Sequence, residues 1–477
     1  MIESGGVTEP PHPRSTLRGI GFYLGAAATA LFMMRELGAS WSTHFPATWP
    51  DAIFAKQGYL AVAAKSPFRP SFYFAFRPIG YPFLLWLLGR SSHLVVIAQT
   101  ALYCAAVIAL CATALRALKS REVGVITVAL IVGIALQAKY ALWNTQILSE
   151  SLAISLGFIT LTAWWRFAIA PTRRRAVFAW VCVVAFLVVR DAHVLPVTIV
   201  IVPVALALAR WGTSLGSEVR RALTAGAIVV VVVAGYSYLS TSASHRAVLS
   251  FHNAIGVRVL PDPQLSKWFV AHGMPLDDAL RERTGKSGLE DNFYASTDPR
   301  FAKYRHWARG GGPRSLVLSL VVLAPHYSHL MYDDLPDLLK GDVRFYDTQS
   351  VYQRLPDRIP VQLGGPTTRR GLTVWLAFAG TALSVSLLLA LRRRRGLRVV
   401  VFGATALLLT IVELYLTWGG DPIETERHVI GALSRLSVIL VIVIASAVDA
   451  IVTPAPPHSA PEVVDVAALG PEVAADA

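Results

Sequence analysis

Long apolar runs separated by short polar turns dominate the pattern of this chain. Several runs reach the roughly 20 residues that one helix needs to cross the hydrocarbon core of a bilayer. Backbone polar groups in lipid must be satisfied within their own segment, so the pattern predicts an all-α polytopic membrane protein. We expect about ten spans, at 20–34, 92–115, 123–143, 147–165, 176–189, 194–209, 222–239, 371–391, 397–418 and 429–452. The runs 176–189 and 194–209 are short, which leaves open a hairpin that crosses only in part.

The composition and the placement of charge agree with a membrane protein. Hydrophobic residues make up 54% of the chain and charged residues 16%, whereas a typical soluble domain has about 25% charged residues. The net charge of +14 would suggest nucleic-acid binding if it covered one soluble face. Here the Lys and Arg clusters lie at alternate ends of the predicted spans. By the positive-inside rule this predicts a plasma (inner) membrane protein with both termini cytoplasmic and no nucleic-acid partner.

The same pattern divides the chain into five parts. We expect a cytoplasmic tail (1–18), an N-terminal transmembrane module (19–240) with a first outer loop (39–80), an extracytoplasmic segment (241–370), C-terminal transmembrane helices (371–452) and a disordered cytoplasmic tail (453–477). The first span is interpreted as a retained anchor. Within the extracytoplasmic segment, the run 315–332 is interrupted by Pro325, which favours an interfacial helix over a crossing.

Cys104, Cys111 and Cys182 all fall inside apolar runs. Cys104 and Cys111 are two helical turns apart on one helix, too far to form a disulfide. We expect all three to be small buried hydrophobic residues.

Ionisable residues near the predicted spans gather at one membrane face. They are Lys139, Glu150, Arg190, Asp191, His193, Glu413, Asp421, Glu424, Glu426, Arg427 and His428. Each one alone is compatible with a snorkelling or interfacial residue. Together they favour an outward-facing polar cavity, because ionisable residues within membrane segments are costly and tend to mark function.

The first outer loop contains one carboxylate among several cations. From 39 to 80, Asp51 is accompanied by Lys56, Lys65, Arg69 and Arg77. A lone acid among cations suits a general base that stays ionised, because nearby positive charge lowers its pKa. The cations suit a phosphate or pyrophosphate group. The alternative is a solvated loop in which the acid simply follows a proline in a turn.

The stretch "RPIGYPFLLWLL" (77–88) places a cation where the chain enters an apolar run. Pro78 and Pro82 are expected to stiffen this entry, and Gly80 to let it bend. Arg77 would then lie at headgroup depth, where a lipid phosphate lies. A purely structural role as a helix-start anchor stays open.

Four short motifs make the chain resemble the GT-C class of polytopic membrane glycosyltransferases. They are "PDAIFAKQGYLAVA" (50–63), "RPIGYPFLLWLL" (77–88), "ILSESLAISL" (147–156) and "GDPIETERHVIGAL" (420–433). The segments "RVLPDPQLSKWFVAHGMP" (258–275) and "APHYSHL" (324–330) are similar to those of uncharacterised relatives. Each motif is short and degenerate, but all four occur in the expected order and on the expected predicted side.

The resemblance implies a glycosyltransferase that moves a hexosyl or pentosyl group from a polyprenyl-phosphate-linked sugar to an envelope acceptor. In that case Asp51 would match the catalytic acid of the first loop. Arg77, Glu150, Arg190 and Arg427 would line the carrier site, and Arg69 would join Arg77 and Arg190 around the phosphate. Tyr81, His193 and His428 complete the expected binding set. Asp51 has no paired acid in its loop, which disfavours the protein O-mannosyl type.

No cofactor is required by this scheme. The sequence has no His, Cys and Asp cluster with ligand spacing, so a divalent metal is compatible with the chain but not indicated. Two other functions stay open. A transporter or flippase of a lipid-linked or anionic precursor would need ionisable residues near mid-membrane. A non-catalytic scaffold of envelope assembly would tolerate changes at Asp51.

Overall fold

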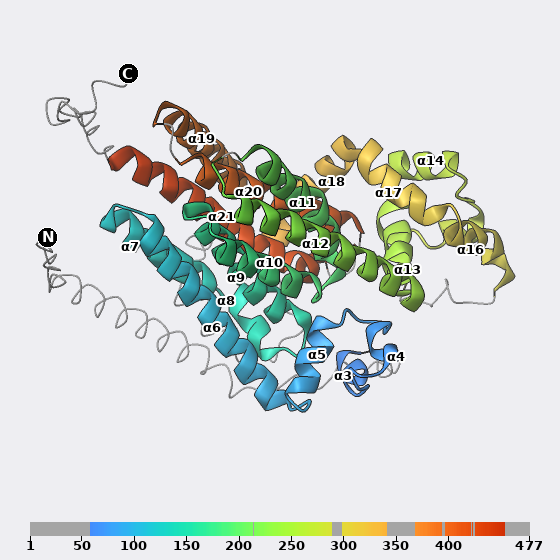
Figure 1. The fold of residues 1–477 in the computed structure, drawn as a ribbon. Coiled ribbons are helices and arrows are strands. Elements are labelled where there is room, and N and C mark those ends of the chain that lie inside the picture. Colours follow the sequence, from blue (N-terminus) through green and yellow to red (C-terminus); the bar gives the residue numbers. More distant parts are fainter. Residues whose placement is uncertain are drawn as a thin grey trace, which may run out of the picture.

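The computed structural model describes residues 58–212, 214–288, 298–340, 368–393, 396–420, 422 and 425–453. Within these ranges every regular element is helical (Figure 1). Asp51, the first predicted span, the predicted amino-terminal tail and residues 454–477 of the predicted carboxyl-terminal tail lie outside the described residues. The all-α prediction is confirmed for the part of the chain that the structure describes.

Seven helices among the described residues are long and apolar enough to cross a membrane. The protein is therefore a multi-pass membrane protein by the length and composition of its helices. The seven are α6 (Ser92–Ala117), α9 (Ser149–Ile169), α11 (Val194–Trp211, preceded by the 3₁₀ turn η2, Asp191–His193), α12 (Ser217–Ser244), α19 (Arg369–Arg393), α20 (Leu397–Gly420) and α21 (Thr425–Val452).

Two further predicted spans form shorter helices. α7 (Arg121–Ala135) and α10 (Arg173–Leu187) each contain 15 residues. At 1.5 Å per residue each is about 22 Å long, less than the roughly 30 Å of a bilayer core. The predicted span 123–143 ends early, because the chain turns after α7 into the short helices α8 (Ala138–Ala141) and η1 (Leu142–Thr145). The expectation of about ten spans is thus met only in part.

α21 occupies the centre of the bundle (Figure 1). It packs against α7, α9, α19 and α20, while α6 packs on α9 and α12 packs on α10 and α11. When α7 and α10 are counted with the seven long helices, successive helices run in opposite directions, so their ends fall into two groups. One, called here the site end, contains the starts of α6, α9 and α21. The other, the basic end, carries Arg116, Lys119, Arg121, Arg166, Arg173, Arg174, Arg175, Arg210, Arg220, Arg221, Arg392 and Arg398.

Short helices cover the site end on the N-terminal side. They are α3 (Tyr59–Ala63), α4 (Pro70–Tyr73) and α5 (Gly80–Leu87). Gly80 was expected to provide a bend, but its role is close approach. Its backbone N–H donates to the carbonyl of Val188 at 2.8 Å, and a Cβ at this position would lie 2.8 Å from the same oxygen. The start of α5 is therefore docked against the end of α10.

The segment after α12 folds into a helical layer beside the site end. Its helices are α13 (Arg246–Asn253), η3 (Ala254–Val259, a π-helix), α14 (Pro263–Ala271), α15 (Asp278–Arg281), η4 (Pro299–Phe301) and α16 (Ala302–Arg309). Phe251, Phe269, Phe301, Tyr304 and Trp307 are buried at its centre. Arg258 lies over the Trp418 ring at 3.5 Å and bonds the Trp418 carbonyl, which ties this layer to α20.

The apolar run 315–332 is broken, as predicted. It forms the end of α17 (Gly312–Val322) and the start of α18 (Ala324–Lys340), with a bend of 83° at the break. Pro325 stands at the second position of α18, where a proline is tolerated. Together the two helices are also apolar enough to be one broken span.

The cysteine prediction is confirmed. Cys104, Cys111 and Cys182 are all buried and unbonded to one another.

Candidate functional site

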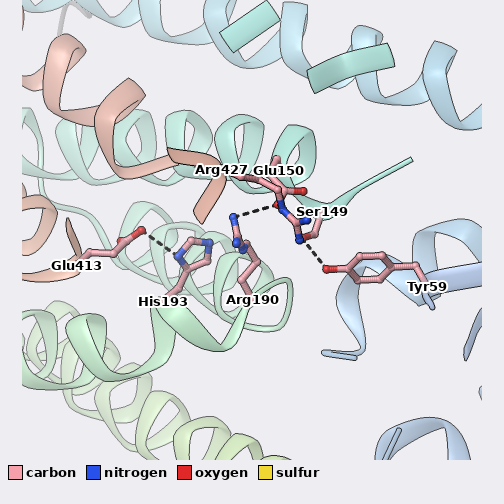
Figure 2. Close-up of polar contacts among 7 residues, drawn as sticks. All are labelled: Tyr59, Ser149, Glu150, Arg190, His193, Glu413 and Arg427. Atoms are coloured by element: carbon pink, nitrogen blue, oxygen red, sulfur yellow. Dashed lines mark hydrogen bonds and ion pairs between the residues drawn. The ribbon is translucent and has the colours of Figure 1, made fainter. Parts of the chain in front are cut away.

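A buried carboxylate at the site end is shared by two arginines. Glu150 is the second residue of α9 and is fully buried. Its Oε1 accepts from Arg427 Nε at 2.6 Å and lies 3.6 Å from Arg190 Nη1 (Figure 2). Arg427 belongs to the start of α21, and Arg190 to the turn between α10 and α11. The positive end of the α9 dipole favours the negative charge of Glu150 at this position.

Arg77 and His428 complete this group, called here the arginine cluster (Arg77, Glu150, Arg190, Arg427 and His428). His428 lies within electrostatic range of all three guanidinium groups. Among the described side chains of the cluster, two guanidinium groups thus engage the one carboxylate, and the third, that of Arg77, acts on His428. The side chains of Arg190 and Arg427 are 10% and 15% exposed, so the cluster is shielded but not sealed. Such an arrangement favours an anion, because desolvated cations gain most from an opposite charge.

Tyr59 connects the first-loop side of the molecule to this cluster. Its hydroxyl lies 2.9 Å from Ser149 Oγ, next to Glu150 in sequence (Figure 2). The Arg77 guanidinium lies 4.8 Å from the centre of the Tyr59 ring, within the range of a cation–π contact. Tyr59 therefore orients Arg77 toward the start of α9.

Tyr81 lies next to the cluster, and its hydroxyl is engaged by the scaffold rather than by the cluster residues. Its hydroxyl donates to Gln99 Oε1 at 2.7 Å. The Gln99 amide in turn donates to the carbonyls of Asn144 and Gln146 at 3.0 and 2.9 Å. Burial raises the pKa of Tyr81 well above its ordinary value, with Tyr59 and Glu150 adding to the effect. The phenol therefore stays neutral and acts as a hydrogen-bond donor, which holds the turn before α9 in place.

A second polar group lies deeper in the bundle and is called here the deep cluster (His193, Glu413 and Arg435). His193 Nδ1 lies 3.1 Å from Glu413 Oε1 (Figure 2), and Arg435 Nη2 donates to the same oxygen. The His193 ring stacks on the Phe186 ring with a centroid distance of 3.8 Å, and the Arg435 guanidinium lies 4.7 Å from the centre of the Phe186 ring. Arg435 follows Arg427 by eight residues on α21, so it lies about 12 Å farther into the bundle.

The structure brings most of the predicted site residues to one end of the bundle. Arg77, Glu150, Arg190, Arg427 and His428 form the arginine cluster. His193 is buried, but it pairs with Glu413 in the deep cluster rather than with the cations. Tyr81 is buried beneath the site and held by Gln99.

The structure does not join Arg69 to the cluster, and Asp51 is untested. Arg69 is exposed just before α4, and none of the contacts described joins it to the arginine cluster. Arg69 is the residue before the short helix α4, which starts at Pro70. Asp51 and Lys56 lie outside the described residues, so the candidate base stays a prediction.

Sequence reasoning missed two residues that the site uses. Arg435 is a lone arginine within the apolar run 429–452, which is itself the signal, since a charge inside a span is costly unless paired. Tyr59 carried no such signal. Its contacts with Ser149 and Arg77 depend on how the first-loop helices dock against α9.

The described residues contain no group of three or more His, Cys, Asp or Glu side chains placed to hold a metal ion. The arginine cluster itself is unsuited to a cation, because its carboxylate is already engaged by two guanidinium groups. Its chemistry is that of binding an anion.

Comparison with known proteins finds no matching family model, no matching curated protein and no matching solved structure.

Proposed function

We propose that this protein is a membrane glycosyltransferase of the GT-C type, which transfers a sugar from a polyprenyl-phosphate donor to an envelope glycan, lipid or protein. The observation that carries the proposal is the arginine cluster, in which Arg190 and Arg427 share Glu150 and Arg77 joins them around His428. In this scheme the basic end faces the cytoplasm of a plasma (inner) membrane, the site end faces outward, and about ten spans cross the bilayer.

The cluster matches a lipid-linked phosphate in charge and in depth. Guanidinium groups bind phosphate oxygens with two parallel hydrogen bonds and keep their charge when partly buried. Arg427 and Glu150 stand at the first turns of α21 and α9, which is where a lipid headgroup meets the ends of spanning helices. A soluble anion would need no such position.

The chemistry is a direct displacement at the anomeric carbon. The Asp51 carboxylate accepts the proton of an acceptor hydroxyl as its oxygen bonds to the anomeric carbon. The bond between that carbon and the phosphate oxygen breaks, and polyprenyl phosphate leaves with its charge held by Arg77, Arg190 and Arg427. Arg69 has no part in this scheme because it lies outside the cluster.

A lipid-linked precursor transporter is the second candidate, and the deep cluster is the observation that favours it. Arg435 lies about 12 Å along α21 from Arg427, and with His193 and Glu413 it forms a buried ionisable group of the kind that alternating-access mechanisms use. His193, Glu413 and Arg435 come from three different segments, η2, α20 and α21, so a change in their pairing would move helices relative to one another.

The proposal is tested first in the native host. The gene is deleted and returned as wild type, as Asp51→Asn or as Asp278→Asn, a matched exposed acid away from the cluster. Envelope glycans and polyprenyl-phosphate sugars are then profiled by mass spectrometry. We expect one glycan to disappear and its lipid donor to build up in the deletion, with wild type and Asp278→Asn restoring both. Full restoration by a normally expressed Asp51→Asn would refute the role of Asp51.

Transfer in detergent separates the two candidates. The purified protein is mixed with membranes of the deletion strain, dissolved in detergent, and with the lipid-linked sugar that accumulates in that strain. A transferase consumes the donor and releases polyprenyl phosphate without any intact bilayer. A transporter leaves the donor unchanged, because no compartments remain to move it between.

A further inference from the structure

A large cavity opens at the basic end of the bundle, far from the arginine cluster. Its volume is about 870 Å³, and it lies between the ends of α6, α9, α19, α20 and α21. This volume is in the upper part of the range of small-molecule sites, roughly 300–1,000 Å³. Nothing in the proposed transfer reaction uses it.

The cavity is deep enough to hold a hydrocarbon chain of one leaflet. Its lining runs from Ile442 on α21 to Thr453 just after that helix, and on α19 from Leu383 to Arg392. At 1.5 Å per residue these stretches are about 15 Å long, half of the 30 Å bilayer core. The deepest part is apolar, with the stacked rings of Trp165 and Phe402 6.3 Å apart at one wall.

The mouth of the cavity is polar and basic. Lys119 from the turn after α6 and Arg392 from α19 both line it and are both exposed. The nearby Asp449 carboxylate is already engaged, since its Oδ1 accepts from the backbone N–H groups of Lys119 and Ser120 at 2.9 and 2.7 Å. Its charge stabilises the start of α7 rather than the cations. Among the described residues no ion pair engages either cation at the mouth, so both can meet an anionic group.

One wall of the cavity belongs to a helix whose outer face is open to its surroundings. α19, which supplies one of its walls, is the least buried of the seven candidate spans. A lipid molecule can therefore enter from the side with its chain already in the hydrocarbon layer. A soluble anion would gain nothing from the apolar inner part of the cavity.

We propose that this cavity binds one anionic phospholipid, with its phosphate between Lys119 and Arg392 and an acyl chain along Trp165 and Phe402. Basic pockets between helix ends recognise anionic headgroups in this way. The lipid fills the space between α19 and α21 and stabilises the packing of α19 on the bundle. This inference is independent of the proposed transferase activity.

The test is a lipid titration of the delipidated full-length protein in detergent. The thermal unfolding midpoint is followed against phosphatidylglycerol and against phosphatidylcholine with the same chains. We expect a saturable rise with phosphatidylglycerol only. Lys119→Gln and Arg392→Gln should each weaken half-saturation about fivefold, since a cation near the membrane surface contributes about 1 kcal/mol to the attraction of anionic lipid.

Three further samples make the result specific. Arg174→Gln removes an exposed cation of the same end outside the cavity and should behave as wild type. Ser446→Phe places a ring inside the cavity and should abolish the rise without lowering the lipid-free midpoint. A chain lacking 454–477 should titrate as wild type.

Each contrary outcome overturns the proposal. An equal rise with phosphatidylcholine, or an unchanged titration of the double variant Lys119→Gln/Arg392→Gln, would mean that lipid stabilises the protein nonspecifically, by solvating its apolar surface. A rise that requires removal of 454–477 would assign the cavity to the carboxyl-terminal segment of the chain.

Discussion

The shared carboxylate of the arginine cluster makes a quantitative prediction about stability. Glu150 is fully buried, and its Oε1 is engaged by Arg427 at 2.6 Å and faced by Arg190 at 3.6 Å. Replacing it by glutamine keeps the shape of the side chain but removes the charge that both guanidinium groups face. Breaking a buried ion pair by removing one partner costs about 3–5 kcal/mol, because the remaining charge is left uncompensated.

The three variants Glu150→Gln, Arg427→Gln and the double variant should therefore not behave additively. Arg427→Gln leaves Glu150 paired with Arg190, so it should cost less than Glu150→Gln, which leaves two cations. The double variant should be no less stable than Glu150→Gln, because its second change removes one of the uncompensated charges. Residues that share one network show such coupling, typically about 0.5–3 kcal/mol.

The assay is the thermal unfolding midpoint of the purified protein in detergent, read by size-exclusion chromatography after heating. Arg174→Gln, at an exposed position of the opposite end, is the control and should leave the midpoint unchanged. If the losses of the two single variants simply add in the double variant, the residues do not form one network, and the anion site inferred from them fails with it.

The same variants also test whether the arginine cluster binds phosphate. Glu150→Gln frees two guanidinium groups, so this variant, once folded, should bind undecaprenyl phosphate in detergent more tightly than wild type. Arg427→Gln removes a cation and should bind it more weakly. Equal affinities in all variants would contradict a phosphate site at this cluster.

Two further predictions concern the scaffold around the site. Gly80→Ala should destabilise the protein by about 1–3 kcal/mol, because the added Cβ would lie 2.8 Å from the Val188 carbonyl oxygen; Gly380→Ala, where nothing lies within 4 Å, should be neutral in the same heating assay. Burial lowers the pKa of His252 from 6.5 to about 4. As the pH falls, His252 is therefore protonated in the unfolded chain at a higher pH than in the folded protein. Its contribution to stability is complete above pH 6.5 and falls by up to about 3 kcal/mol as the pH drops toward 4. His252→Gln should flatten this part of the pH profile of the unfolding midpoint, and an unchanged profile would exclude the histidine as its source.

The sequence by itself determined the helical membrane class, the alternation of helix directions and the end at which the polar residues gather. These follow from apolar run length and from charge at the helix ends, which are local properties of the chain. Glu150, Arg190 and Arg427 could be assigned to one face for the same reason. The break before Pro325 followed from local backbone chemistry.

Only the tertiary structure decided which of these residues meet. Glu150 contacts Arg427 across 277 positions of sequence, and His193 pairs with Glu413 instead of joining the cations. Arg69 faces solvent although it lies eight residues before Arg77. Gly80 serves close packing and not bending, because its neighbour is a carbonyl of another helix. Partners of this kind depend on the docking of helices distant in sequence, and the local sequence pattern does not determine that geometry.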